Sequence, residues 1–259
     1  MLSRNTSKLI YSLRDKKNRD EQKLFVAEGP KIINELILSP YLSYLIEIFI
    51  EKSFLENDNN AKVLLEKIPK NVTITIVNNN ELKNIALTKT PNSIIALLKK
   101  PKDNKLNDID SEIWKKWFLI LEDVQEPGNV GTILRTAEWF GIKNIVCSRC
   151  TADIFNPKTI QSTMGAIFNL NILQTDLSYF IQTTKPYLYA TSLQGDNIYK
   201  TPFKTQGGII LGNESKGVKL ETIKSANKII SIPGKGKTQS LNVSVSFGII
   251  CSEIYQNFF

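Results

Sequence analysis

The stretch IISIPGKGKTQSLNVSVSFGII, residues 229–250, decides how the rest of the chain is interpreted. An apolar run ends at Pro233, a loop rich in glycine and lysine follows, and Ser240-Leu241-Asn242 then opens a segment of small and apolar residues. This order predicts a strand, a flexible loop and the start of a helix. Ser240 or Asn242 can cap that helix, and the glycines let main chain approach a ligand closely. On its own, the stretch is typical of an ordinary capped strand-to-helix connection.

The composition indicates a globular chain with a basic surface. The chain has 259 residues, with 33 Lys and Arg against 25 Asp and Glu and a formal net charge of +8. This length suits one large domain or two modest ones. The positive charge favours a polyanionic partner, most simply nucleic acid, although a general bias toward lysine and asparagine would produce the same charge.

The absence of histidine excludes several classes of catalyst. Ser-His-Asp hydrolysis, histidine general-base chemistry and most zinc sites need an imidazole. The cysteines Cys147, Cys150 and Cys251 make no disulfide framework and suit a reducing compartment. We therefore expect no metal. Because no segment approaches membrane-spanning length, we also expect a cytoplasmic protein without a membrane partner.

Arginine is scarce in this lysine-rich chain, so its positions are informative. A planar guanidinium holds phosphate or carboxylate in a bidentate way that an ammonium cannot reproduce. Residues 1–23 combine basic side chains with apolar residues at roughly helical spacing. They predict a basic amphipathic helix or pair of turns that grips a phosphate backbone, or a solvated helix packed by its apolar face. We expect RNA contacts from Arg14, Lys17, Arg19 and Lys31.

The N-terminal part of the chain predicts a small α/β domain, because strand-like and helix-like stretches alternate. The expected strands are 25–29, 45–50, 72–77 and 92–98, and the expected helices are 31–38 and 61–68. The asparagine-rich stretches 57–60 and 78–80 are typical of loops. A polar, charged stretch with a proline follows and indicates a linker. We expect a domain at 1–98, a linker at 99–113 and a second domain at 114–259.

The second domain also alternates strands and helices, with two unusual loops. The expected strands are 118–121, 144–147, 168–172, 187–191 and 208–211, and the expected helices are 132–140 and one that begins at 156–158. The polar loop 122–131 carries Asn129, and Arg135 follows on the first turns of the helix. The loop 211–217 brackets Glu214 with glycines, lacks GxxxxGK[ST], and suits a cationic or zwitterionic ligand because a carboxylate would repel phosphate. Open α/β sheets bind ligands at such loops.

Three motifs together resemble those of the SpoU/TrmH family of RNA ribose methyltransferases, within the SPOUT class. The motifs are EPGNVGTILRTAEWFG (126–141), LGNESKGV (211–218) and IPGKGKTQSLNVSVSFG (232–248). Residues 20–98 resemble, more weakly, the small substrate-binding domain with an L30e-like fold that often precedes the family's catalytic domain. Two departures are small: Gly234 stands where methionine is common, and Gln161 stands where a basic residue is expected.

The resemblance implies an α/β fold whose C-terminal chain is threaded into a deep trefoil knot. It also implies that S-adenosyl-L-methionine binds in this knot, mainly through main chain, and that the protein is a homodimer with its C-terminal helix, near 243–255, at the interface. The residues that would line the methyl-donor pocket are Thr191, Leu211, Gly212, Asn213, Gly217, Ile232, Pro233 and Leu241.

The activity that the resemblance implies is methylation of a ribose 2′-hydroxyl, in ribosomal RNA of the 23S type by analogy with the two-domain layout. Arg135 would be the principal catalytic residue. A guanidinium stays protonated in ordinary protein environments, so we expect Arg135 to clamp the substrate phosphate and hydroxyl, and a role as base stays open. The residues that would orient these groups or the donor are Asn129, Glu214, Ser240 and Asn242; loop hydrogen bonding or helix capping would also explain them.

Other functions remain open at this point. A transfer RNA 2′-O-methyltransferase, a SPOUT enzyme that methylates a base nitrogen, and a noncatalytic RNA-binding or ribosome-assembly factor would share much of this sequence pattern. Arg135 and the glycine-rich loops favour catalysis over the noncatalytic factor. The missing GxGxxG disfavours an oxidoreductase that binds a dinucleotide.

Overall fold

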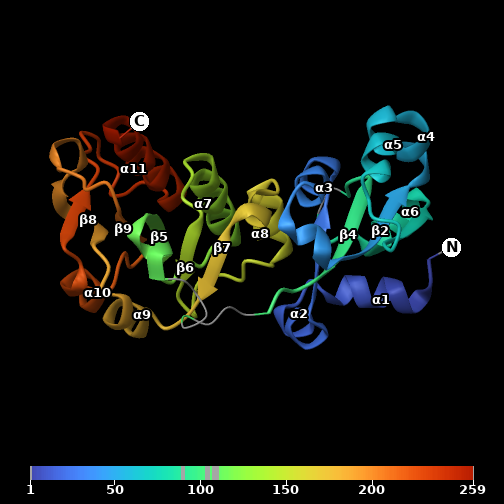
Figure 1. The fold of residues 1–259 in the computed structure, drawn as a ribbon, viewed down its shortest axis with the longest axis horizontal. Helices are drawn as coiled ribbons and strands as arrows, with labels where there is room; N and C mark the ends of the chain where they lie inside the picture. The colour runs from blue at the N-terminus through green and yellow to red at the C-terminus, as the bar shows by residue number, and fades with distance from the viewer. Residues whose placement is uncertain (1, 89–90, 103–105, 107–110, 259) are drawn as a thin grey trace. The chain divides into compact units, whose positions relative to one another are not determined.

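The computed structural model describes residues 2–88, 91–102, 106 and 111–258. The chain divides into two compact units, and Figure 1 shows their helices and strands. The first comprises Met1–Lys102 and Asp153–Asn169, and the second comprises Asp103–Ala152 and Leu170–Phe259. Within the linker expected at 99–113, residues 103–105 and 107–110 lie outside the described residues.

The first unit is built on a four-stranded mixed sheet with the order β1-β4-β2-β3. Both β1 and β2 run antiparallel to β4, whereas β2 and β3 are parallel. The central β4 is apolar and buried except at its last residue, as expected for a strand covered on both faces. The strands are β1 Leu24–Glu28, β2 Leu45–Glu51, β3 Thr73–Val77 and β4 Ile94–Lys99.

The helices of the first unit begin with α1 and α2, in the basic N-terminal segment that was predicted as one helix or a pair of turns. Ile10 and Leu13 are fully buried in the core, so this segment packs by its apolar face. The prediction of a loop at 78–80 was wrong, because Asn78 and Glu81 form a reciprocal capping box that starts α6. The helices are α1 Arg4–Ser12, α2 Lys16–Gln22, α3 Pro30–Ile37, α4 Lys52–Asn57, α5 Asn59–Glu66 and α6 Asn79–Ile85.

The segment Asp153–Asn169 belongs to the first unit although it follows strands of the second. Its helix α8, Pro157–Thr163, begins after Asn156, whose side chain accepts the Lys158 amide. The rings of Phe155 and Phe25 lie 4.7 Å apart. Gly165 has a φ of +96°, and a Cβ there would lie 2.5 Å from the Cβ of Glu35, so only glycine permits this close packing.

The second unit contains a six-stranded parallel sheet with the order β10-β8-β9-β5-β6-β7. The strands are β5 Trp117–Leu121, β6 Asn144–Cys147, β7 Asn171–Gln174, β8 Leu188–Asn197, β9 Gly207–Leu211 and β10 Lys228–Ser231. The strand predicted at 168–172 was wrong at its start, because residues Ala166–Asn169 form a 3-10 turn in which Phe168 packs on Tyr41. Strand order reverses between β5 and β9, the position at which open α/β sheets bind ligands.

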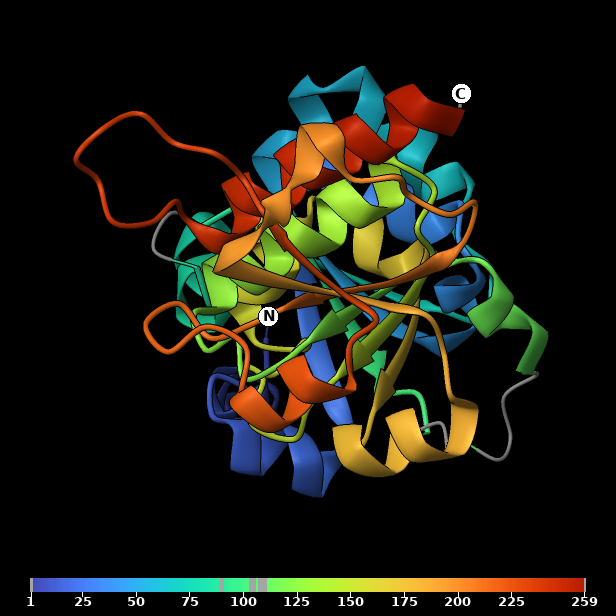
Figure 2. The same ribbon diagram turned by 90° about the vertical axis from the view of Figure 1, so that its left-hand side faces the viewer.

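Helices cover both faces of this sheet. In Figures 1 and 2, α7 and α11 lie on one face, and α9 and α10 lie on the other. The expected loop 122–131 was too long, because α7 begins at Pro127, where proline suits the first turn and Glu126 accepts the Gly128 amide. The helices are α7 Pro127–Trp139, α9 Leu177–Thr184, α10 Leu220–Ser225 and α11 Val243–Phe258.

Residues 229–250 have the predicted order of strand, loop and helix. β10 is followed by residues 232–242, which have no regular structure and are largely exposed, and α11 comes next. Figure 2 shows these residues as a long open loop beside the sheet. Among the described residues, no helix has both the length and the hydrophobicity needed to cross a membrane.

Candidate functional site

Glu214 lies in the loop after β9, opposite the loop after β5. Its carboxylate accepts the main-chain amides of Gln125 at 3.2 Å and Glu126 at 3.1 Å. It also accepts the side-chain amide of Asn129 at 3.0 Å. These hydrogen bonds join the two loops at the point where the strand order of the sheet reverses.

Asn129 extends this contact to the C-terminal part of the chain. Its Oδ1 accepts the Nδ2 of Asn242 at 3.0 Å. The Oδ1 of Asn242 in turn accepts the amide of Ser244 at 2.9 Å and its hydroxyl at 2.6 Å, so Asn242 also caps α11. We call Glu214, Asn129 and Asn242 the amide chain. Sequence motifs that are 85 and 113 residues apart therefore meet in one hydrogen-bonded chain.

The ionisation of Glu214 is set by this environment. Partial burial by itself raises the pKa of a carboxyl group, but hydrogen bonds from Asn129 and from main-chain amides outweigh it and hold the pKa of Glu214 below its ordinary value. Glu214 is therefore an ionised acceptor at neutral pH. It is a hydrogen-bond anchor and a weak base.

Arg135 lies on α7, six residues beyond Asn129, which is about 9 Å along a helix axis at 1.5 Å per residue. Its side chain is exposed. It makes no hydrogen bond or ion pair with any residue that the structure describes. The structure therefore leaves this guanidinium available to an external phosphate or carboxylate.

Ser240 is not brought into the amide chain. It is exposed in the loop 232–242 and precedes the capping residue Asn242 by two positions. The helix-capping explanation offered for both residues therefore applies to Asn242 and fails for Ser240. A direct role of Ser240 toward substrate stays a prediction.

The loop after β9 has a compact main-chain turn. Asn213 and Gly217 form a two-way main-chain bridge, and the Oδ1 of Asn213 accepts the amides of Ser215 and Lys216. A Cβ on Gly212 would lie 2.1 Å from the carbonyl carbon of Gly217, so the turn excludes any side chain there. The proposed donor-binding residues Leu211, Gly212, Asn213 and Gly217 thus form one ordered element.

The other proposed donor-binding residues lie at the ends of β8 and of the loop 232–242. The Oγ1 of Thr191 donates to the Ile210 carbonyl at 2.9 Å. Ile232 follows Ser231, whose hydroxyl donates to the Leu193 carbonyl, and Leu241 precedes Asn242 of the amide chain. The loop 232–242 is therefore held at one end by β8 and at the other end by the amide chain. Pro233 is exposed within the loop.

Leu193 is a candidate that the sequence analysis missed. Residues 191–195 bulge out of β8, because Ala190 pairs with Ile229 but Asp196 pairs with the next residue, Ile230. Leu193 is 73% exposed on this bulge, and Leu241 is 49% exposed. Exposed leucines beside open main chain fit a ligand with an aromatic ring and polar groups, such as S-adenosyl-L-methionine. An apolar residue two positions before Gly195, a glycine that packs on the main chain of Ile230, was the available sequence signal.

Asp123 supports the loop that carries Glu214. It has a φ of +56° and accepts the Ser148 hydroxyl at 2.6 Å and the Lys219 ammonium at 2.8 Å. Burial raises the pKa of Asp123, but Lys219 and Ser148 outweigh it and lower the pKa. Its carbonyl also accepts the Asn213 side chain at 2.9 Å. Asp123 is thus a second residue that sequence reasoning missed, and adjacent acids in EDVQEP were its only signal.

The proposed RNA contacts lie in the first unit and have different surroundings. Lys17 and Lys31 are exposed. Arg14 is also exposed, although its Nη2 donates to the Ala86 carbonyl at 2.7 Å and its guanidinium lies over the Tyr11 ring. These three cations remain available to a phosphate backbone.

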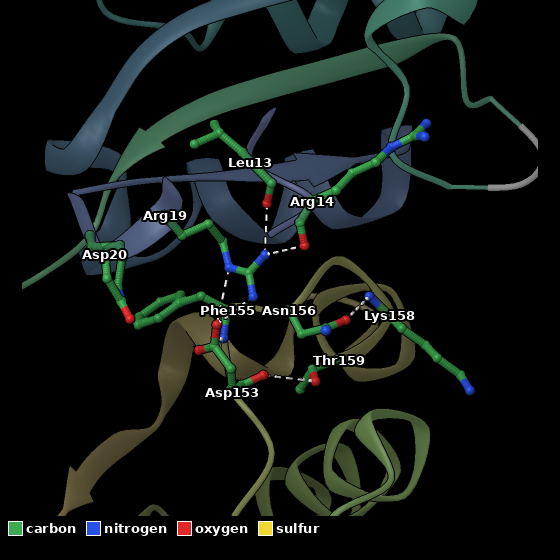
Figure 3. A network of polar contacts seen from close by, with 10 residues as sticks. Leu13, Arg14, Arg19, Asp20, Asp153, Phe155, Asn156, Lys158 and Thr159 are labelled. Carbon is green, nitrogen blue, oxygen red and sulfur yellow. Dashed lines mark hydrogen bonds and ion pairs between the residues drawn. The ribbon is translucent and has the colours of Figure 1, made fainter. Parts of the chain in front are cut away.

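Arg19 must be removed from the proposed RNA contacts. Its side chain is 1% exposed and binds the Asp153 carboxylate at 2.6 Å (Figure 3). Its Nη1 also donates to the carbonyls of Leu13 and Arg14, both at 2.7 Å. Because these donors bind acceptors inside the first unit, the Arg19 guanidinium is not available to bind an RNA phosphate. No cluster of His, Cys, Asp and Glu that could hold a metal occurs among the described residues.

Family models match both parts of the chain. Residues 116–252 match the model of the SpoU rRNA Methylase family. Residues 5–96 match the model of the MRM3-like substrate binding domain. The first match covers more than half of the chain and contains every member of the amide chain as well as Arg135.

Three known proteins illustrate the similarity. The 23S rRNA (guanosine(2553)-2′-O)-methyltransferase RlmP of Bacillus subtilis is 27% identical over 92% of this chain and 91% of its own length. A TrmH-family protein from Porphyromonas gingivalis has a solved structure with a TM-score of 0.82, 29% identity and 99% coverage of both chains. The AdoMet-bound rRNA methyltransferase from Sinorhizobium meliloti has a TM-score of 0.83 and 25% identity, and the match covers 100% of this chain and 97% of that one.

Proposed function

The chain belongs to the SpoU rRNA methylase family, and we propose that it transfers a methyl group from S-adenosyl-L-methionine to a ribose 2′-hydroxyl of 23S-type ribosomal RNA. The observation that carries this proposal is that the amide chain meets at Asn129, in the first turn of α7, the helix that also presents an exposed, unpaired Arg135. The similarity to RlmP supports the choice of RNA.

Arg135 is assigned to the phosphate of the target nucleotide. A guanidinium binds phosphate through charge-assisted, bidentate hydrogen bonds, and it remains protonated at neutral pH. Fixing this phosphate fixes the attached ribose. Orientation of this kind supplies much of the rate of a reaction between two bound groups, so the assigned role of Arg135 is to position the substrate.

The amide chain is assigned to the ribose. Glu214 and Asn242 determine which way the Asn129 amide faces, because Glu214 accepts from its nitrogen and Asn242 donates to its oxygen. The side-chain nitrogens of Asn129 and Asn242 each carry a second hydrogen, and we propose that these hydrogens are donated to ribose oxygens. Glu214 acts through Asn129 and is a positioning residue.

S-adenosyl-L-methionine, when bound, supplies an electrophilic methyl group on a cationic sulfur. We propose that the turn at Gly212 and the main chain of residues 232–242 hold its polar groups. Leu193 and Leu241 would cover its apolar ring, since both are exposed at the loop ends. The proposed donor-binding set is Thr191, Leu193, Leu211, Gly212, Asn213, Gly217, Ile232, Pro233 and Leu241.

The proposed assembly is a cytoplasmic homodimer with α11 at the interface. A shallow groove runs along α11, and Val245, which lines it, is 51% exposed. The groove is lined by Tyr199, Val245, Gly248, Ile249, Ser252, Glu253 and Gln256. We retain as proposals the domains 1–98 and 114–259 with the linker 99–113, the trefoil knot around residues 229–250, and RNA contacts by Arg14, Lys17 and Lys31.

The decisive experiment is transfer of labelled methyl from S-adenosyl-L-methionine to total RNA that lacks the modification, with wild type beside Arg135→Ala. A 2′-O-methyl mark on 23S ribosomal RNA that disappears in the variant supports the proposal. A mark on transfer RNA would correct the substrate. Failure of the wild-type chain to bind the donor would overturn the enzymatic function and leave a noncatalytic RNA-binding factor.

A further inference from the structure

Trp139, in the last turn of α7, has an unusual exposure for an indole ring. It is 82% exposed, the largest exposed fraction among the large apolar side chains that the structure describes. Trp114 is 8% exposed, and Trp117 is half-buried. Keeping an indole ring in water forfeits the free energy of burial that large aromatic side chains normally gain. Such a ring is therefore a candidate binding surface.

Trp139 lies one helical turn beyond Arg135. Residues four apart on a helix are neighbours on one face, so the two side chains share a surface of α7. The opposite face is occupied, since Leu134 and Ala137 are fully buried and Phe140 packs edge-on against Tyr255 of α11. Among the described residues, Trp139 makes no ring contact or hydrogen bond.

We infer that Trp139 stacks on a base of the bound RNA, next to the nucleotide whose phosphate Arg135 holds. This inference rests on the proposed function and extends it to a residue that binds substrate. Proteins that recognise single-stranded RNA stack splayed bases on aromatic side chains and hold the adjoining phosphates with cations. Arg135 and Trp139 present this pair of groups on one helix face.

A second copy of the chain is the competing occupant of this face. The unpaired Arg135 argues against it, because burial of an uncompensated guanidinium in a protein interface is costly. RNA brings a phosphate for Arg135 together with a base for Trp139. The exposed cation beside the exposed ring therefore favours RNA.

The test uses tryptophan fluorescence of the full-length protein with short oligoadenylate and with unmodified 23S ribosomal RNA made by transcription in vitro. Stacking quenches the exposed indole, so we expect RNA to quench the wild type and to leave Trp139→Ala almost unchanged. Trp139→Ala should weaken RNA binding and raise the KM for RNA by about 5- to 100-fold, the loss expected for one stacked base, with little change in kcat. Trp139→Phe should retain most of the affinity.

Leu220→Ala is the matched control, because it truncates a 77% exposed apolar side chain in the same unit. It should leave RNA affinity unchanged. Wild-type RNA affinity in Trp139→Ala would overturn the inference. A second result would also overturn it. In that result, Trp139 of the RNA-free wild-type dimer is already shielded from quenching by acrylamide, and Trp139→Ala dissociates the dimer. Donor binding is measured in every variant, and its absence in the wild type would contradict the proposed function without affecting the quenching result.

Discussion

Arg19 and Arg135 lie in different units and differ in every feature of their surroundings. Arg19 is 1% exposed and donates to the Asp153 carboxylate and to two main-chain carbonyls of the first unit. Arg135 is exposed on α7 and has no partner among the described residues. In the sequence, both were candidates for phosphate binding because arginine is scarce in this lysine-rich chain.

The difference shows that burial decides what an arginine does. A buried guanidinium must have its charge compensated and its donors satisfied. The hydrogen-bond donors of Arg19 are therefore occupied by acceptors within the first unit. An exposed guanidinium costs little to leave unpaired, because water solvates it. The guanidinium donors of Arg135 therefore remain available to a ligand.

Arg19→Ala should lower the stability of the first unit by about 3–5 kcal/mol, the loss expected when one partner of a buried ion pair is removed. The reason is that Asp153 and the carbonyls of Leu13 and Arg14 lose their donor. The thermal unfolding midpoint of the full-length chain measures the change. Arg4→Ala, which removes an exposed arginine from α1, is the control and should leave the midpoint nearly unchanged. Unchanged stability with lost RNA affinity would make Arg19 an RNA contact after all.

Arg135→Ala should reduce kcat/KM for RNA methylation by about 10²–10³-fold, as for removal of one preorganised charge-stabilising donor. Its unfolding midpoint should stay that of the wild type, because an exposed side chain without partners contributes little to stability. Methyl transfer and thermal unfolding are measured on the same preparation. Arg149→Ala, an exposed arginine elsewhere in the second unit, is the matched control. Loss of folding in Arg135→Ala would contradict the contrast with Arg19.

Glu214→Gln should slow methyl transfer, with a loss of about 1.5–3 kcal/mol of transition-state stabilisation, the range for hydrogen bonds to a charged group. The Gln side chain can accept at one atom, but it replaces the other carboxylate oxygen with a donor. Since the folded pKa of Glu214 is lowered, its stabilising contribution is complete above the unfolded pKa and disappears as pH falls through the folded value. The wild-type rate should therefore show no step from Glu214 between about pH 6 and 8, since the ordinary pKa is about 4.3. A step in this range that Glu214→Gln removes would disprove this assignment.

Lys17→Ala should have the smallest effect, a modest loss of RNA affinity and a decrease of about 1 in the slope of log K against log salt. Lys17 is exposed, and its contact with Glu21 at 3.9 Å is a surface pair of little energetic value. Binding is measured over a range of salt concentrations. Lys52→Ala, which removes an exposed lysine with the same kind of i,i+4 pair on α4, is the control. An unchanged salt slope in Lys17→Ala would remove this residue from the RNA surface.

Sequence reasoning found the elements of the site but placed several of them inaccurately. Asn129 was expected in a loop and lies in the first turn of α7, because Pro127 and the Glu126 cap start the helix earlier. Ser240 and Asn242 looked equally suited to cap α11, and only the structure assigns the cap to Asn242. Leu193 and Asp123 were missed, since a bulge in β8 and a positive φ leave little trace in a single sequence.

The amino-acid sequence alone is enough to predict the local order of strand, loop and helix around residues 229–250, the basic character of the chain and the motifs by which its family is identified. These properties depend on residue type and on spacing along the chain. Three-dimensional packing was needed to show that Glu214, Asn129 and Asn242 form one hydrogen-bonded chain, that Arg19 is buried against Asp153, and that Trp139 is exposed. These properties depend on contacts between distant residues and on solvent access, because packing determines which polar groups satisfy each other and which remain available to a ligand.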